Sequence, residues 1–224
     1  MLLRISYTCL IILLAEFNPA SKGNYSAEGF ASYYAEEFNG RKTANGEIFD
    51  MTDYTAAHRT LPFNTFLKVT NKENNFSLLV RINDRGPFVK SRILDLSEAA
   101  ARRIGSYMHG YVKVRAEEVE LMPLTPEQDS LFLKNLVVDC LGNIDKLSAL
   151  SLSIWSTADL MHALYIANDL YLREDFDKIL ICPRGKGQYR KYHLVISGIK
   201  TKAELMKQKI YFEMQGFMNV QSLL

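Results

Sequence analysis

Short β-rich runs separated by turn residues fill the first half of this 224-residue chain. From about Glu28 to Leu121, runs of Val, Ile, Leu and Phe alternate with clusters of Asn, Asp, Gly and Pro, as expected for strands joined by tight turns. We expect strands at residues 66–70, 77–82, 92–96, 111–115 and 118–121. So many short strands in so little chain predict a small, mainly β barrel, because closure leaves no strand edge unpaired.

One helix is well marked inside this strand-rich half. Ser97 belongs to the residue types that accept hydrogen bonds at a helix N-terminus, and the Ala-rich run 98–104 favours helix. Gly105 can end the helix, because glycine adopts the left-handed conformation that often follows a last turn. The pattern predicts a single short helix packed against the barrel.

The pattern changes after residue 121, where Pro123 and Pro126 mark a boundary. We therefore predict a first domain at 28–121, a linker at 122–148 and a second domain at 149–224. In the second domain we expect strands at 149–155, 177–182, 191–197 and 219–223, and helices at 158–172 (capped by Thr157) and 201–215 (ended by Gly216). The order βαββαβ predicts an α+β unit with both helices on one face of its sheet.

The first 22 residues have the features of an export signal. Arg4 precedes an apolar run, Cys9–Ala15, and the small residues Pro19–Ser21 follow it. The run is shorter than the roughly 18 to 20 apolar residues that span a bilayer, and a buried N-terminal helix is the alternative interpretation. We expect secretion across an inner membrane to the periplasm or cell envelope, without a lipid anchor, because Cys9 stands at the start of the apolar run and not after it.

Charge and cysteine content exclude several classes of function. The 27 Lys and Arg residues nearly balance the 25 Asp and Glu residues, so the sequence predicts no nucleic-acid partner. The cysteines have no zinc-binding spacing, and we predict neither a metal nor an organic cofactor. After removal of a signal, Cys140 and Cys182 remain, either paired as a disulfide or as two buried thiols.

Polar residues that suit glycosidic bond cleavage gather in three segments, 39–50, 55–62 and 81–87. Such cleavage needs a proton donor and stabilisation of a cationic sugar ring, for which carboxyl groups are suited. Glu47, Asp50 and Asp84 are the candidates. Asp84 follows an apolar strand and precedes a Gly-Pro turn, so it either faces a groove or caps the turn, and residue reasoning alone favours the cap.

Several neighbouring side chains have two open interpretations. His58 either orients Asp84 and contacts a sugar hydroxyl, or is a structural hydrogen-bonding residue. Arg41 and Lys42 either grip a carboxylate or are solvated loop residues. We also class Arg81 and Arg85, the neighbours of Asp84, as candidate substrate-binding residues.

The three polar segments together resemble the signature of the RlpA (rare lipoprotein A) family. The matching stretches, in order, are Ala31-Ser-Tyr-Tyr34, Gly40-Arg-Lys-Thr-Ala-Asn-Gly-Glu47, Asp50-Met51, Leu61-Pro62, Val80-Arg-Ile-Asn-Asp-Arg-Gly-Pro-Phe88 and Asp95-Leu-Ser-Glu-Ala-Ala-Ala101. They cover nearly all of the first domain. The resemblance implies a six-stranded double-psi β-barrel, related in fold to expansins and to membrane-bound lytic transglycosylase A.

The same resemblance implies a function. Asp84 falls on the family's functional acid, with Glu47, Asp50 and His58 as polar companions and with Tyr33 and Tyr34 in place to contact sugar rings. The implied reaction is non-hydrolytic cleavage between N-acetylmuramic acid and N-acetylglucosamine in peptidoglycan glycan strands, which leaves 1,6-anhydro ends. The alternative is a non-catalytic wall-binding or wall-loosening protein.

The second domain resembles a SPOR module in its βαββαβ order, in Ser153-Ile-Trp-Ser156 and in Leu194-Val-Ile-Ser-Gly198. This resemblance implies binding to glycan strands stripped of stem peptides, and division-site wall proteins as possible partners. Trp155 is then a candidate for stacking on sugar rings, with core packing as the alternative.

Overall fold

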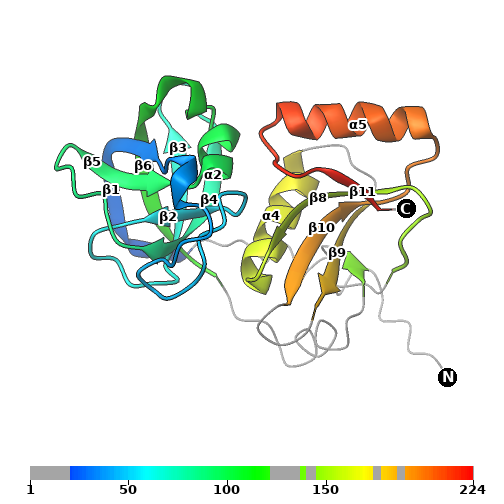
Figure 1. Cartoon of the computed structure of the whole chain (residues 1–224), viewed down its shortest axis with the longest axis horizontal. Coiled ribbons are helices and arrows are strands. Elements are labelled where there is room, and N and C mark those ends of the chain that lie inside the picture. The colour runs from blue at the N-terminus through cyan, green and yellow to red at the C-terminus, as the bar shows by residue number, and fades with distance from the viewer. Residues whose placement is uncertain (1–20, 122–136, 140–144, 174–177, 186–189, 224) are drawn as a thin grey trace.

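The computed structural model describes residues 21–121, 137–139, 145–173, 178–185 and 190–223. Figure 1 shows two units side by side, a barrel formed by β1 to β6 and a sheet flanked by two longer helices. In the described part of the chain, no helix is long and apolar enough to cross a membrane. The predicted export segment ends at residue 22, so almost all of it lies outside the described residues and it stays a prediction.

Six strands close the first unit into a barrel with the order β1-β5-β2-β4-β3-β6, which confirms the predicted fold class. The pairs β1–β5 and β2–β4 are parallel, and the other pairs are antiparallel. The strands are β1 (Ser21–Tyr33), β2 (Thr55–Ala57), β3 (Phe66–Asn71), β4 (Ser77–Asp84), β5 (Arg92–Leu96) and β6 (Tyr111–Glu120). Short 3-10 turns, η1 (Glu36–Phe38) and η2 (Tyr107–His109), lie in the connections.

The predicted strand pair at the end of this unit is wrong. Residues 111–120 form one strand, β6, which pairs with β1 along one edge and with β3 along the other. Val112, Val114 and Ala116 all point into the barrel and are fully buried. Ala116 therefore continues the inward alternation at the point where the sequence suggested a turn.

Strand β1 begins earlier than the domain boundary predicted at Glu28. It starts at Ser21 and overlaps the last two residues of the predicted export segment. Its first half is rich in Ser, Lys and Asn and has no apolar alternation, so the usual strand signal is missing there. Antiparallel pairing with β6 from Ser21 onward is what holds this polar half in the sheet.

The predicted barrel helix is present as α2 (Glu98–Arg103). The Ser97 side chain accepts a hydrogen bond from the main-chain N–H of Ala100, at 3.2 Å, and Gly105 follows the helix with φ +72°. Buried alanines on α2 allow the helix to lie close against the barrel. The local capping signals in this segment were sufficient to predict the helix.

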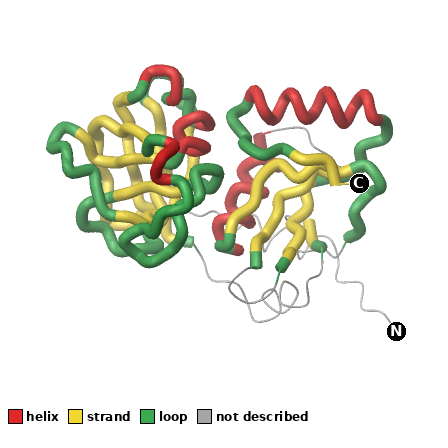
Figure 2. Tube along the Cα trace, in the orientation of Figure 1, coloured by secondary structure: helices red, strands yellow, loops and turns green. Residues whose placement is uncertain are grey.

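The second unit is an antiparallel sheet with the order β11-β8-β10-β9-β7 and two helices. From β8 onward its elements follow the predicted βαββαβ order, and Figure 2 shows the helices and strands of this unit separately coloured. Strand β7 lies inside the predicted linker and adds an edge to the sheet. The elements are β7 (Val138–Asp139), β8 (Ser151–Thr157), α4 (Leu160–Arg173), β9 (Ile179–Arg184), β10 (Lys191–Ile196), α5 (Lys202–Met214) and β11 (Gln221–Leu223).

Helix α4 begins after Asp159. The prediction that Thr157 caps this helix is wrong. The Asp159 carboxylate accepts a hydrogen bond from the main-chain N–H of His162, at 2.9 Å, whereas Thr157 ends β8 and accepts from the N–H of Asp159. Both residue types suit an N-cap, and tertiary pairing of β8 decides between them. Helix α5 begins after Thr201 as predicted, because the Thr201 hydroxyl accepts from the N–H of Glu204.

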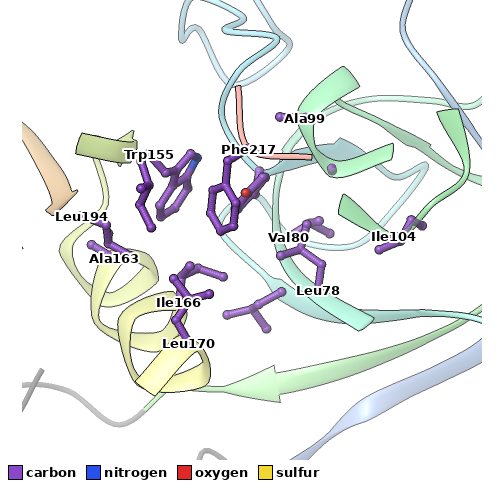
Figure 3. Close-up of a cluster of buried hydrophobic side chains, with 14 of the residues drawn as sticks. Leu78, Val80, Ala99, Ile104, Trp155, Ala163, Ile166, Leu170, Leu194 and Phe217 are labelled. Atoms are coloured by element: carbon purple, nitrogen blue, oxygen red, sulfur yellow. The ribbon is translucent and has the colours of Figure 1, made fainter. Parts of the chain in front are cut away.

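Buried side chains of the barrel and of the second unit form one continuous hydrophobic cluster. Figure 3 shows Trp155 and Phe217 of the second unit in this cluster with Leu78 and Val80 of β4. The Tyr54 ring of the barrel stacks on Trp155, with ring centroids 4.6 Å apart. The sequence predicts two separate domains, whereas the structure joins them through this shared core.

Cys182 has no disulfide partner among the described residues, and it is buried in a small second cluster with Leu180 and Val195. Burial raises its pKa to about 11, so the thiol is protonated and unreactive at neutral pH. Cys140 lies outside the described residues, so the alternative of a disulfide between the two is open.

Candidate active site

Asp84 is the last residue of β4, and its side chain reaches the surface of the barrel. One carboxylate oxygen, Oδ1, accepts hydrogen bonds from the main-chain N–H groups of Ala44 and Arg85, both at 2.8 Å. The other oxygen, Oδ2, accepts the Tyr34 hydroxyl at 2.7 Å. The carboxylate is therefore held in one orientation, and Oδ2 keeps more of its accepting capacity than Oδ1 does.

Tyr34 is suited to remain a hydrogen-bond donor to Asp84. Burial raises the pKa of the Tyr34 hydroxyl well above its usual range, and the hydrogen bond to Asp84 and the negative charges of Asp84 and Asp95 raise it further. Its ring contacts Phe38 and Phe49, with centroids 5.6 and 4.9 Å away. The hydroxyl is thus fixed in place and protonated across the physiological pH range.

Asp84 lines a groove of about 640 Å³ on the barrel surface, which we call the Asp84 groove. It is bounded by residues that follow β1, by the loop that precedes β2, and by the β4–β5 connection. Aromatic and basic side chains predominate, with two carboxylates among them. The lining residues are Ser32, Tyr33, Tyr34, Ala35, Phe38, Arg41, Lys42, Ala44, Asp84, Arg85, Gly86, Phe88, Arg92 and Asp95.

Asp95 is the second carboxylate of the groove, and the sequence analysis did not single it out. Its Oδ1 accepts the Ser32 hydroxyl at 2.6 Å and lies 3.4 Å from Arg92 Nε. It sits on β5 between Leu94 and Leu96, which are fully buried, so the alternation of the strand turns it away from the core. A carboxylate at such an outward position was the signal that could have identified it.

Glu47 anchors the loop whose Ala44 N–H donates to the Asp84 carboxylate. Its carboxylate forms two hydrogen bonds with the Arg81 guanidinium, at 2.8 and 2.9 Å, and accepts a third from the Asn83 side chain at 3.2 Å. Burial raises the Glu47 pKa, but the hydrogen bonds and charge of Arg81 outweigh burial and leave the pKa below its ordinary value. Glu47 is therefore an ionised anchor in this structure and does not line the Asp84 groove.

His58 is buried and neutral. Its Nδ1 accepts main-chain N–H groups of Thr60 and Leu61, at 3.2 and 3.0 Å, which places the ring proton on Nε2, 3.1 Å from the Tyr25 hydroxyl. Burial lowers its pKa, and the charges of Arg59 and Arg85 lower it further. Its link to Asp84 is through the main chain, since the His58 N–H donates to the Asp84 carbonyl at 3.2 Å.

Residues 26–116 match the family model described as lytic transglycolase. This chain is 56% identical over 97 residues to the endolytic peptidoglycan transglycosylase RlpA of Pasteurella multocida, in an alignment that covers 43% of this chain and 33% of the relative. It is 54% identical over 93 residues to the probable endolytic peptidoglycan transglycosylase RlpA of Treponema pallidum, covering 42% and 29%. The barrel thus matches the lytic transglycolase model and is similar to part of these RlpA proteins, and we refer to it as the RlpA-type domain.

The chain spans about a third of the length of these curated relatives. A solved structure of apo-expansin from Clavibacter michiganensis aligns at 14% identity with a TM-score of 0.37, over 79% of this chain and 81% of that chain. The family match ends at residue 116, so the resemblance of the second unit to SPOR modules stays a prediction.

Asp50, predicted as a companion of Asp84 in the site, does not line the Asp84 groove. Its Oδ1 accepts the main-chain N–H and the hydroxyl of Thr52, and its Oδ2 lies 2.9 Å from Lys191 Nζ of the second unit. Burial raises the Asp50 pKa, but these contacts with Thr52 and Lys191 leave it below its ordinary value. In this structure Asp50 links the two units and does not accompany Asp84.

The basic residues predicted to bind substrate differ in their exposure and contacts. Arg41 and Lys42 are exposed and line the Asp84 groove, and their role in substrate binding stays a prediction. The Arg85 guanidinium stacks over the Phe63 ring at 3.7 Å and donates to the His58 carbonyl, although the residue also lines the groove. Arg81 is 4% exposed and bound to Glu47, so its predicted contact with substrate is wrong.

Two predicted stacking residues have different positions. Tyr33 lines the Asp84 groove, and its ring contacts the Tyr107 ring, with centroids 5.0 Å apart. Trp155 is 4% exposed, and its indole N–H donates to the Thr52 carbonyl at 3.2 Å across the contact between the two units. The prediction that Trp155 stacks on sugar rings is therefore wrong, and core packing is its role here.

Within the residues that the structure covers, no group of three or more His, Cys, Asp and Glu side chains is arranged to hold a metal.

Proposed function

We propose that this protein is a lytic transglycosylase that cuts peptidoglycan glycan strands in the cell envelope. The observation that carries the proposal is Asp84, a carboxylate that lines a groove in an RlpA-type domain and is held in one orientation by hydrogen bonds. Relatives of this domain are named endolytic peptidoglycan transglycosylases. Secretion to the periplasm follows from the same proposal, because the substrate lies outside the inner membrane.

Asp84 acts first as the general acid. It donates a proton to the oxygen that joins N-acetylmuramic acid to N-acetylglucosamine, and the bond from that oxygen to the muramic C1 breaks. We assign the proton to Oδ2, because Oδ1 already accepts two main-chain N–H groups. The Tyr34 hydroxyl keeps Oδ2 facing the groove during this step.

The Asp84 carboxylate then acts as the base. It takes the proton from the muramic C6 hydroxyl while that oxygen attacks C1, which closes a 1,6-anhydro ring and restores protonated Asp84. One carboxyl group serves both steps, so no second acid is needed. Asp95, held by Ser32 and Arg92, adds negative charge that favours a cationic sugar ring in the same groove.

The competing function is a wall-binding or wall-loosening protein that cuts nothing. A groove rich in aromatic and basic residues would suit binding alone equally well. The proposed partnership with division-site wall proteins depends on the second unit, whose face against the barrel is occupied by the shared core.

The test is digestion of purified sacculi, with and without stem peptides, followed by mass spectrometry of the released fragments. The wild type is expected to release fragments with 1,6-anhydromuramic ends, and Asp84→Asn is expected to release none. Binding of sacculi without any release by the wild type would favour the non-catalytic alternative.

A further inference from the structure

Phe88 is the most exposed aromatic residue beside the Asp84 groove. Its side chain is 91% exposed, and the residue lines the groove together with Phe38, which is 37% exposed. The adjacent Val89 is 51% exposed and extends the apolar surface. Burial would stabilise a large aromatic side chain, so packing within the fold does not explain why Phe88 is exposed here.

The loop that carries Phe88 is held in place by Arg59. The Arg59 guanidinium donates to the carbonyl of Pro87 and to the carbonyl of Val89, both at 2.8 Å, and also to the carbonyls of Lys90 and Arg92. The main chain on both sides of Phe88 is therefore fixed. The ring is thus presented to solvent from a main chain that needs no ordering on binding, which lowers the entropic cost of binding a ligand against it.

The chemistry around Phe88 indicates what would cover it. A pyranose ring has one apolar face of C–H groups and an edge of hydroxyls, and an aromatic ring packs against the apolar face. The same groove offers Arg41 and Lys42 for carboxylates and Asp84 for a hydroxyl or glycosidic oxygen. A glycan with anionic substituents uses all three kinds of group at once, whereas an apolar peptide would leave the charged groups unpaired.

We propose that Phe88 is a sugar-stacking platform that positions a pyranose ring of the glycan strand next to Asp84. The proposal rests on the proposed function for the identity of the strand. It adds a residue that fixes the register of the strand, and register decides which glycosidic oxygen lies over the Asp84 carboxylate.

The experiment measures binding separately from cleavage. In the Asp84→Asn background, co-sedimentation with stem-peptide-free sacculi gives an apparent affinity without turnover. Phe88→Ala is expected to weaken this affinity by about tenfold, which corresponds to the roughly 1.4 kcal/mol typical of one aromatic contact. Phe88→Trp is expected to restore most of it, because a larger ring keeps the stacking surface.

The matched control is Phe76→Ala in the same background. Phe76 is 55% exposed and is not among the residues that line the groove. Its removal is expected to leave the affinity unchanged, and neither variant is expected to change the melting temperature, because both side chains are largely in solvent. In the cleaving protein, Phe88→Ala is expected to raise KM more than it lowers kcat.

Equal affinity of Phe88→Ala and its parent overturns the inference, and so does an equal loss in Phe76→Ala, which would indicate general adhesion of exposed rings. Failure of the proposed function has a different signature. Binding that depends on Phe88, in a wild type that releases no anhydro ends, supports the stacking platform and overturns the enzymatic step.

Discussion

Replacement of Glu47 by Gln tests whether Glu47 anchors a loop by binding Arg81 or transfers a proton during cleavage. Glu47 neutralises Arg81, whose side chain is 5% exposed, whereas the Glu47 side chain is 42% exposed. Loss of one partner from a fully buried ion pair costs about 3 to 5 kcal/mol, and an exposed pair contributes below about 1 kcal/mol. This half-buried pair lies between the two limits, and the Gln amide oxygen can still accept one hydrogen bond. We expect the free energy of unfolding to fall by about 2 kcal/mol.

The same substitution is expected to lower activity only in part. The loop anchored by Glu47 carries the Ala44 N–H that donates to Asp84, so loosening the loop misplaces one of the three hydrogen bonds to Asp84. The expected effect is a lower kcat with an unchanged pH profile, because Glu47 does not exchange the catalytic proton. Asp84→Asn, in contrast, is expected to remove activity with little effect on stability.

The assay is urea unfolding of the full chain, combined with release of anhydro fragments across a pH series. Glu28→Gln is the control, because Glu28 pairs with Lys72 and Arg115 in solvent and its replacement is expected to unfold like the wild type. If Glu47→Gln keeps its stability but loses all activity, or if its pH profile loses a titrating limb, Glu47 is a proton-transfer group and the reasoning is refuted.

Three further predictions concern other contacts. Tyr34→Phe removes the hydroxyl that donates to Asp84 Oδ2, and we expect kcat to fall about tenfold at similar KM in steady-state cleavage assays; an unchanged kcat would contradict it. Trp155→Ala leaves a cavity between the units and is expected to cost about 3 to 5 kcal/mol in urea unfolding; a loss below about 1 kcal/mol would contradict this packing. Burial raises the Asp53 pKa to about 6, against opposing charge from Arg81, so the folded state binds more protons than the unfolded state between about pH 4 and 6. Stability should fall by up to about 3 kcal/mol as pH rises through that window, and Asp53→Asn should flatten the fall in thermal melts, whereas a parallel curve would refute the assignment.

Features set by local sequence were predictable. Ser97 and Gly105 mark the two ends of helix α2, and both could be recognised because capping depends on residues within one or two turns. The strands that end at Asp84 and Leu96 follow from short apolar runs between turn residues. Asp84 lies at the end of its strand, in agreement with its position after an apolar run, although its sequence neighbours alone favour a turn cap. It does accept the following main-chain N–H of Arg85, so both interpretations describe part of what it does.

Features set by distant contacts were not predictable in the same way. The pairing of Glu47 with Arg81 joins residues that are 34 positions apart. The sequence marked both as site residues because each lies in one of the polar segments, 39–50 and 81–87, and it did not indicate that they pair with each other. The ion pair between Asp50 and Lys191 depends on how the second unit lies against the barrel. No local pattern reports such an arrangement.

One signal of the shared core was present in the sequence. Leu78, Leu79 and Val80 form a continuous apolar run on β4, and successive residues of a strand point to opposite faces. A strand that is apolar on both faces is covered on both faces. That pattern indicated that something packs on the outside of the barrel at β4, and the second unit occupies that position.

In the proposed function, Asp84 cuts the glycan strand without adding water across the bond. The most direct measurement is digestion of stem-peptide-free sacculi in heavy-oxygen water, with the mass of each newly formed muramic end determined by mass spectrometry. We predict 1,6-anhydro ends that contain no heavy oxygen, formed by the wild type and absent with Asp84→Asn. Reducing ends that carry heavy oxygen, or anhydro ends formed at full rate by Asp84→Asn, would contradict it.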